Sequence, residues 1–286
     1  QTLHGSSFKY GAGGKGSNQA VAAHRAGADI TLVTKIGQDF FGQVAMDFYQ
    51  NEGMNTDYIL RDNLKETGIA LIMVDEISAQ NKIVVVSGAC GNFTAENIEH
   101  CRGLIEHASI LLLQHEINQD ALYKVIEIAD DAGVRIVLNP APAAPIPDEI
   151  LKKIDLITPN ETEAQTLTGV QINDIEDARR AASALLAKGV HEVIITLGSL
   201  GAYVTDGKQD WMIDSIKVDV VDTTGAGDAF NGGLVTALDE GKNLLDAARF
   251  GNVVGALSVT KIGTAPSMPD REQIRQLYKA TYGLDI

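Results

Sequence analysis

Short apolar runs alternate with stretches of helical periodicity from about residue 109 onward. The apolar runs are "SILLLQHE", "VRIVLNPAP", "DLITPN" and "HEVIITLG", and the helical stretches between them are "QDALYKVIEIADDAG", "DEILKKI" and residues 161–189. Continuous apolar strands that alternate with helices are typical of βαβ units, whose parallel strands are covered on both faces. The pattern predicts an α/β fold with an open, mostly parallel sheet flanked by helices.

Residues 57–93 follow a different pattern. The strand-like runs "TGIALIMVD" and "NKIVVVSG" are joined by the polar "EISAQ", with no helix between them. This arrangement predicts antiparallel strands in a small sheet set apart from the main core. We therefore expect a main α/β domain at residues 1–56 and 94–286, with the small sheet at 57–93. The C-terminal third is predicted to consist of helices at 227–241, 243–263 and 270–283.

Composition narrows the class of protein. A chain of 286 residues can form one main domain with a small appendage, and 45% hydrophobic with 21% charged residues is ordinary for a globular protein. The net charge of −15 argues against broad binding to nucleic acid or anionic membranes. Cys90 and Cys101 fit neither a disulfide framework nor a zinc spacing, which indicates reduced thiols and a cytoplasmic protein. No apolar run approaches a membrane span, and the first ten residues contain no signal-peptide core.

The segment "DTTGAGDAF", residues 222–230, is the first candidate for chemistry. An apolar strand is expected to run into it at "KVDVV", and a helix is expected to follow. Gly225 and Gly227 can expose their N–H groups at the helix N-terminus, where they would bind a phosphate. Asp228 either favours the helix dipole or accepts the proton of an alcohol that attacks the phosphoryl group. The second use suggests phosphoryl transfer to a hydroxyl.

A second glycine-rich loop lies in "YGAGGKGSNQAVAAHRAGA". The pattern Gly11-x-Gly13-x-x-Gly16 fits a dinucleotide-binding loop only weakly, because no strand precedes it and no acid follows about twenty residues on. It is not a Walker loop, since Lys15 is followed by glycine. Two interpretations remain open: a flexible turn before an alanine-rich helix, or a loop in which Lys15 and Asn18 bind a polyhydroxylated ligand.

A third loop is "DLITPNETEAQTLTG". Asn160, followed by Glu163 three residues later, matches a helix N-cap with a capping-box glutamate. A glutamate near a phosphate site could instead hold magnesium through water.

Two long sequence signatures resemble those of a known protein family and occur in the same order along the chain as in that family. "GGKGSNQA" with Gly27 and Gly37 forms the first, "DTTGAGDAFNGG" forms the second, and "NETE" and "TLGSLG" lie between them. The chain resembles the ribokinase-like sugar kinases, also called the phosphofructokinase B family, over nearly its whole length. The resemblance implies the Rossmann-like ribokinase fold, with the strands around residues 67–86 forming a small β-sheet lid.

The resemblance also implies a role for each matching position. The implied catalytic base is Asp228, and the implied anion hole consists of Gly225, Ala226 and Gly227. The implied sugar contacts, besides Asp228, are Gly14, Lys15, Gly16, Ser17, Asn18 and Glu116. The implied ATP contacts are Asn160, Thr196, Leu197, Gly198, Ser199, Leu200, Gly201, Gly227 and Asn252. The implied potassium site consists of Asp222, Thr224, Ser258, Lys261, Gly263 and Ser267, and Glu163 is expected near magnesium.

Within the family, "GGKGSNQAVAA", "LNPAPA", "ITPNETEA" and "DTTGAGDAF" most resemble members that phosphorylate ribose. The implied reaction is ATP-dependent phosphorylation of D-ribose at the 5-hydroxyl, giving D-ribose 5-phosphate and ADP, with Mg²⁺ required and K⁺ activating. A homodimer formed through the lid is also implied. The family usually begins with a further strand and an Asn-x-Asp segment, so we expect that strand to be missing from this chain. Three alternatives remain: a kinase for deoxyribose, fructose or a nucleoside; a non-catalytic sugar- or nucleotide-binding protein; and, more remotely, a nicotinamide oxidoreductase.

Overall fold

The structure is a computed structural model of the chain, and it describes residues 6, 8, 10–74 and 81–286. The α-helices are α1 (Lys15–Ala26), α2 (Phe40–Asn51), α3 (Ala95–His100), α4 (Arg102–Glu106), α5 (Gln119–Ala132), α6 (Asp148–Leu151), α7 (Glu161–Thr168), α8 (Ile175–Ala187), α9 (Ala226–Asp239), α10 (Leu244–Ser258) and α11 (Arg271–Tyr282). The strands are β1 (Thr34–Ile36), β2 (Ile59–Arg61), β3 (Ile69–Val74), β4 (Asn81–Val86), β5 (Ile110–Leu113), β6 (Arg135–Leu138), β7 (Leu156–Ile157), β8 (Glu192–Thr196), β9 (Ala202–Thr205) and β10 (Asp210–Ile213).

The central sheet has six strands in the described part of the chain, in the order β10-β9-β8-β7-β6-β5. Strands β5 to β8 pair in parallel, whereas β9 and β10 are antiparallel to their neighbours. This confirms the predicted α/β fold with a mostly parallel sheet. Because the parallel strands follow one another along the chain, their carboxyl ends meet at one edge of the sheet, where ligands bind in open α/β folds.

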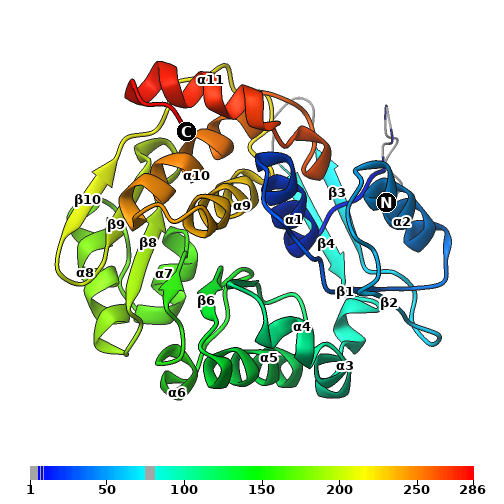
Figure 1. The fold of residues 1–286 in the computed structure, drawn as a ribbon. Coiled ribbons are helices and arrows are strands. Elements are labelled where there is room, and N and C mark those ends of the chain that lie inside the picture. The colour runs from blue at the N-terminus through cyan, green and yellow to red at the C-terminus, as the bar shows by residue number, and fades with distance from the viewer. Residues whose placement is uncertain (1–5, 7, 9, 75–80) are drawn as a thin grey trace.

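Helices cover both faces of this sheet, and alternate strand residues point to opposite sides. Val137 and Ile194 belong to a core shared with α1, α9, α10 and α11, whereas Ile136, Leu138 and Ile195 belong to a core shared with α3 to α8. Figure 1 shows α1, α9 and α10 on one side of the molecule and α5 and α6 on the other. Burial on both sides explains why the strands are apolar throughout.

The long helical stretch predicted at residues 161–189 is two helices. The chain leaves α7 at Gly169, and Asp174 then begins α8 by accepting a hydrogen bond from the N–H of Asp177. Helical periodicity alone did not locate this break, because the periodicity continues across a glycine and a new N-cap.

Strands β3 and β4 form a separate antiparallel pair, in which Ile69 is paired with Val86 and Leu71 with Val84. This confirms the predicted small antiparallel sheet, which we call the lid, while its connecting turn "EISAQ" lies outside the described residues. Figure 1 places the lid on the opposite side of the molecule from β10. Cross-strand partners share a face of the pair. One face therefore carries a row of exposed apolar side chains: Ile69, Leu71, Met73, Val84 and Val86.

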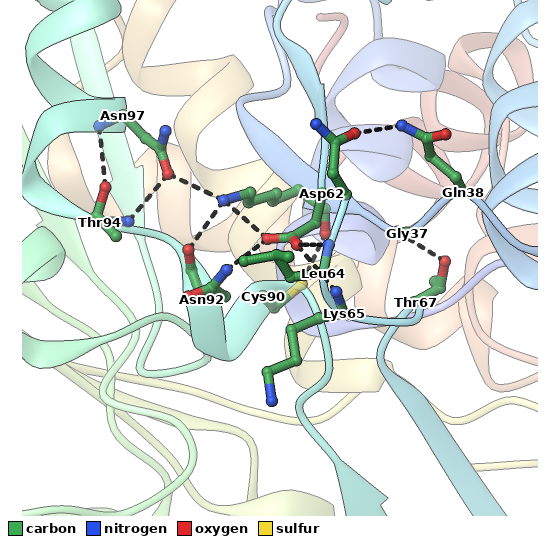
Figure 2. A network of polar contacts seen from close by, with 12 residues as sticks. Gly37, Gln38, Asp62, Leu64, Lys65, Thr67, Cys90, Asn92, Thr94 and Asn97 are labelled. Atoms are coloured by element: carbon green, nitrogen blue, oxygen red, sulfur yellow. Dashed lines mark hydrogen bonds and ion pairs between the residues drawn. The ribbon is translucent and has the colours of Figure 1, made fainter.

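The base of the lid is held by a buried ion pair, shown in Figure 2. Asp62, just after β2, accepts hydrogen bonds from Lys35 Nζ of β1 at 2.9 Å and from Asn92 Nδ2 at 2.6 Å. The N–H groups of Leu64 and Lys65 also donate to Asp62. The hydrogen bond from Lys35, followed by that from Leu64, holds the pKa of Asp62 well below its ordinary value. The segments that enter and leave the lid are thus tied to β1, which pairs with β2 in parallel.

The strand expected at "KVDVV" is absent, which corrects that prediction. Residues 214–220 have no regular secondary structure, and Val220 and Val221 are exposed. The backbone instead bonds to the end of α10, because the N–H groups of Val221 and Asp222 both donate to the carbonyl of Val259. A strand needs a neighbouring strand to accept its ladder of hydrogen bonds, and none lies beside this segment in the described part of the chain.

Candidate active site

The N-terminus of α9 forms one wall of the site. Gly225 precedes the helix with φ 81°, a left-handed conformation that a residue with a side chain rarely adopts. The first N–H groups of a helix lack intrahelical partners. Those of Gly225, Gly227 and Asp228 find no other acceptor among the residues that the structure describes. The loop therefore offers these N–H groups to an anion, and binding of a phosphate there stays a prediction.

Asp228 lies in the first turn of α9 and is buried. Its Oδ2 accepts a hydrogen bond from Asn18 Nδ2 at 2.8 Å, and its Oδ1 accepts one from Gln19 Nε2 at 2.9 Å. Each carboxylate oxygen thus has one donor from α1. Burial raises the pKa of Asp228 above its ordinary value, although the charge of Lys15 and these two hydrogen bonds oppose that rise. A carboxylate with a raised pKa is better suited to accept a proton near neutral pH.

Close packing of α1 against α9 brings these donors into place. A Cβ on Gly232 of α9 would come within 2.5 Å of the Ala22 Cβ and 2.6 Å of the Gln19 carbonyl oxygen. Only glycine fits there without moving a helix. The alanine-rich sequence of α1 and the glycine of α9 therefore fix how near Gln19 comes to Asp228.

A cavity of about 160 Å³ opens at the carboxyl ends of the parallel strands, in front of Asp228. It brings together residues from all three loops singled out in the sequence. Its lining residues are Lys15, Asn139, Ala141, Thr158, Asn160, Glu163, Thr196, Thr223, Gly225, Ala226, Gly227, Asp228 and Asn231.

The residues expected to contact the sugar lie at the start of α1. Lys15 and Asn18 belong to the first turn of this helix, not to a flexible loop. The N–H of Lys15 donates to Glu116 Oε2 at 2.8 Å, and burial raises the pKa of Glu116. A Cβ on Gly14 would lie 3.7 Å from the same Glu116 oxygen. Gly14 to Asn18 and Glu116 are therefore neighbours in space, as the resemblance implies, although Ser17 is engaged elsewhere, because its hydroxyl accepts a hydrogen bond from Tyr49.

Asn18 has one unused group. Its Oδ1 is a buried acceptor without a hydrogen-bond partner, the one such side-chain atom found among the described residues. A buried polar atom is normally paired, so an unpaired one at the side of a cavity indicates a place for a ligand donor. A hydroxyl group is a donor of this kind.

The residues expected to contact ATP are only partly brought together. Asn160 and Thr196 form an isolated bridge and both line the cavity. Residues Gly198–Leu200 form a short 3-10 turn beyond β8, with Leu200 exposed. Asn252 does not line the cavity, and its Nδ2 donates to the carbonyl of Asp214 at 3.0 Å.

Asn160 and Glu163 form the predicted capping box. Asn160 Oδ1 accepts from the Glu163 N–H, and Glu163 Oε2 accepts from the Asn160 N–H, both at 2.9 Å. Burial raises the pKa of Glu163. The residue also lines the cavity, so its capping role does not remove it from the ligand side.

Three of the positions expected to bind potassium, Asp222, Thr224 and Gly263, are in contact at the loop before α9. Asp222 accepts from the N–H of Thr224 at 2.9 Å and from the N–H of Gly263 at 3.0 Å, which ties the two loops together. Burial raises the pKa of Asp222, but these hydrogen bonds more than offset it and leave the pKa below its ordinary value. Ser258 and Ser267 are buried, whereas Lys261 is exposed.

Several residues of the site were not singled out in the sequence. Gln19, Gln114, Asn139, Thr158 and Asn231 form a chain of buried or half-buried polar contacts behind Asp228. Three of them directly follow strands β5, β6 and β7. The signal that could have found them is a polar residue at the carboxyl end of each apolar strand, where open α/β sheets place their ligands.

The sequence and the fold both match proteins of one family. The family model for pfkB carbohydrate kinases matches residues 1–271 of the chain. The chain belongs to the pfkB carbohydrate kinase family. This agrees with the resemblance found in the two glycine-rich signatures, and it removes the dinucleotide-binding interpretation of the first.

Sequence identities and a structural match to individual members of the pfkB family show how similar the chain is to them. The chain is 42% identical over 273 residues to a ribokinase of Haemophilus influenzae, covering 96% of this chain and 89% of that protein. It is 34% identical over 277 residues to a deoxyribokinase of Salmonella typhi, covering 96% and 90%. A solved structure of Arabidopsis thaliana ribokinase complexed with ribose and ATP matches with a TM-score of 0.92 at 33% identity, covering 98% and 91%.

None of the helices in the described part of the chain is long and apolar enough to cross a membrane. Cys90 is half-buried and Cys101 is buried, and both are free thiols.

Proposed function

We propose that the chain is an ATP-dependent kinase that transfers the γ-phosphoryl group of ATP to the 5-hydroxyl of D-ribose, giving D-ribose 5-phosphate and ADP. The observation that carries this proposal is the buried carboxylate of Asp228, placed at a helix N-terminus beside N–H groups that have no other acceptor among the described residues. The related ribokinases, and the one whose structure holds ribose and ATP, support the choice of substrate.

In this reaction Asp228 accepts the proton of the sugar hydroxyl as the hydroxyl oxygen attacks the γ-phosphorus. A bond forms between that oxygen and the phosphorus, and the bond from the phosphorus to the ADP oxygen breaks. The N–H groups of Gly225 and Gly227 would stabilise the negative charge on the transferring group, and that of Ala226 would join them on giving up its hydrogen bond to the Thr223 carbonyl. Lys15, which lines the same cavity, offsets the charge of Asp228.

The sugar would lie against the start of α1. The unpaired Asn18 Oδ1 would accept a hydrogen bond from one hydroxyl, and Glu116 would accept from another. When a buried acceptor is paired with a hydroxyl group of the sugar, the site selects strongly against sugar analogues that lack this hydroxyl. With such an analogue bound, the buried acceptor would stay unpaired. The backbone of Gly14 and Gly16 leaves room for close approach.

The nucleotide would lie on the other side of Asp228. Asn160 and Thr196 line the cavity there, and the turn from Thr196 to Gly201 would form the wall of the nucleotide site. Asn252 would contribute only after giving up its hydrogen bond to Asp214, or through its backbone.

Magnesium fits the acidic side of this cavity. Glu163 is a single carboxylate there, and one of its oxygens has no partner within the capping box, so it can bind the water shell of Mg²⁺. When bound with ATP, the ion would neutralise charge on the phosphates.

A potassium ion fits the loops around Asp222. The proposed positions offer mainly neutral oxygen atoms, from carbonyls and from the hydroxyls of Ser258 and Ser267, with the single carboxylate of Asp222, and such a set of ligand atoms suits a monovalent cation. Asp222, Thr224, Ser258, Lys261, Gly263 and Ser267 are the positions proposed, several through their carbonyls. A higher melting temperature in potassium chloride than in tetramethylammonium chloride would support this site, and equal melting temperatures would contradict it.

The lid is proposed to pair with the lid of a second copy. The main domain is residues 1–56 and 94–286 in this proposal, and the lid segment is 57–93. Covering the apolar face that includes Leu71 and Val84 would remove exposed apolar surface from water. Light scattering should give a dimer for the natural chain, and a monomer when Leu71→Lys and Val84→Lys are combined. Leu64→Lys, at an exposed position off this face, is the control and should stay dimeric.

The test of the activity is ADP release by the 286-residue chain with ATP and Mg²⁺, with and without K⁺. We expect release that depends on D-ribose and increases with K⁺. A higher kcat/KM with 2-deoxy-D-ribose would favour the second candidate, a deoxyribose kinase, which the 34% identity to a deoxyribokinase supports. Sugar binding without ADP release would indicate a non-catalytic binding protein. Use of ATP and two free thiols favour a cytoplasmic location.

A further inference from the structure

Gln19 has no assigned role, although it is 1% exposed in the middle of the site. It lies among the small apolar residues of α1, where an unpaired amide would be costly. Its Nε2 donates both to Asp228 Oδ1 and to Asn139 Oδ1, each at 2.9 Å. Its Oε1 accepts from Gln114 Nε2 at 2.5 Å. The amide therefore uses both N–H groups and its oxygen.

These contacts allow only one orientation of the Gln19 amide. Turning it over would place Oε1 against the oxygens of Asp228 and Asn139 and its N–H groups against the N–H groups of Gln114. Asn139 is itself fixed, because its Nδ2 donates to the carbonyl of Thr158 at 3.0 Å. Gln114 and Asn139 directly follow β5 and β6. The ends of two sheet strands thus determine where Gln19 points.

We infer that Gln19 is a positioning residue, which aligns the Asp228 carboxylate with the carboxyl ends of β5 and β6. This rests on the proposed function, in which Asp228 is the base. Gln19 differs here from its neighbour Asn18. Asn18 keeps a free oxygen for a ligand, whereas Gln19 has no group left and acts on the substrate only through Asp228.

Gln19→Met tests the role because methionine keeps the length of the side chain but donates no hydrogen bond. Losing a hydrogen bond to a charged group should lower kcat by about 10 to 100-fold. The KM values for sugar and ATP should change little, because Gln19 contacts neither. The ionised carboxylate of Asp228 also loses a hydrogen-bond donor, which raises the pKa of Asp228. The acid limb in the pH profile of kcat should therefore move to higher pH.

Gln43→Met is a matched control. Gln43, on α2, also donates from Nε2 to an aspartate, Asp47 Oδ1, at 2.6 Å, but the pair is exposed and far from the cavity. The same replacement there should leave turnover and the pH profile unchanged.

Gln19→Glu is a second variant, which retains the shape if the methionine variant does not fold. The new carboxyl can donate to Asp228 only while it is protonated. Turnover should therefore peak at a lower pH than in the natural enzyme and fall as the pH rises. This direction is opposite to the shift expected for Gln19→Met.

Gln114→Met tests the link to the strand ends. Gln114 reaches Asp228 through Gln19, so this change should shift the acid limb in the same direction by a smaller amount. In the Gln19→Met background it should have almost no further effect on kcat. If the fold-losses of kcat in the two single variants multiply in the double variant, Gln114 has no role in aligning Gln19.

The outcomes separate the inference from the proposed function. Absence of ADP release by the natural chain with every sugar would remove the function itself. An active natural chain, an inactive Asp228→Asn variant, an unchanged acid limb in Gln19→Met and an unchanged pH optimum in Gln19→Glu would together overturn the inference and leave the function standing. A lower melting temperature with an unchanged acid limb would also overturn it, because it would show a purely structural role.

Discussion

Asn18 Nδ2 lies 2.8 Å from Asp228 Oδ2, although 210 residues separate the two along the chain. This contact joins the two glycine-rich signatures of the pfkB family into one site. The helix from the first signature supplies the donors, and the helix from the second supplies the carboxylate and the free N–H groups. In the proposed function the first segment would bind the polyol and the second would bind the transferring anion, a pairing that a sugar kinase needs.

Asp228→Asn should abolish most of the turnover, because an amide cannot accept the proton of the sugar hydroxyl. We expect kcat to fall by about 10² to 10⁴-fold, while the affinity for ATP measured by calorimetry is retained. Asp239→Asn, an exposed change at the other end of α9, is the control and should keep full activity. Near-normal turnover of Asp228→Asn would remove Asp228 from the role of base.

The pH dependence of kcat/KM should show an acid limb from Asp228. Burial raises its pKa, and only the ionised form can accept a proton, so activity is lost as the pH falls through that pKa. The limb should lie above the ordinary aspartate pKa of about 3.9. Burial also raises the pKa of Glu116. The pH profile of kcat/KM for the Glu116→Gln variant therefore shows which of the two carboxylates causes the acid limb. The limb should persist in that variant, and its disappearance would assign it to Glu116 instead.

Asn18→Leu should weaken sugar binding more than nucleotide binding. The change removes both the donor to Asp228 and the free Oδ1 acceptor. We expect the sugar KM to rise by about ten-fold or more, whereas the KM for ATP should remain within about two-fold and serves as the internal control. Steady-state kinetics with each substrate varied in turn measure both values, and an equal rise in both would contradict the assignment.

Gly232→Ala should push α1 away from α9. The added methyl group would come within 2.5 Å of the Ala22 Cβ, and relieving this overlap should cost about 1–3 kcal/mol of unfolding free energy. Turnover should fall as well, because the donors of Asp228 move with α1. Gly103→Ala is the matched control: its Cβ meets nothing within 4 Å in α4, so stability should not decrease. Equal stabilities of the two variants in urea titrations would refute the packing argument.

Asp62→Asn should destabilise the base of the lid. It should also make the stability of the protein change less as the pH is lowered. The folded pKa of Asp62 is held well below its ordinary value, mainly by Lys35. Its contribution is therefore present above the ordinary pKa of about 3.9 and is lost as the pH falls further toward the folded pKa. The variant should melt at a lower temperature near pH 7 and lose less on acidification. Calorimetry at several pH values measures this, and curves parallel to those of the natural chain would argue against it.

The main sheet and the helix that begins before Asp228 were predictable because their signals are local. Apolar runs separated by amphipathic stretches give β5 to β8 and their helices, and the glycines before Asp228 give a helix start with exposed N–H groups, whose binding of an anion stays a prediction. The capping box at Asn160 and Glu163 is likewise a pattern of four residues. Each of these depends on neighbours along the chain.

What could not be predicted depends on contacts between distant segments. The run "KVDVV" has a strand-like composition, yet no strand of the described residues lies beside it to pair with. The short parallel pair of β1 and β2 carries too few residues for a pattern. Gln19 looks like one polar residue in an alanine-rich helix, and only the folded chain shows its three partners.

The long separation between Asp228 and its donors also affects how the enzyme acquires activity when it folds. Strands β5 to β8 pair with neighbours in the chain, so the central sheet can form early from contacts of modest loop length. The carboxylate receives Asn18 and Gln19 only when α1 docks on α9, across 210 and 209 residues. During refolding from denaturant, recovery of kinase activity should therefore lag behind recovery of the circular dichroism of the sheet and helices.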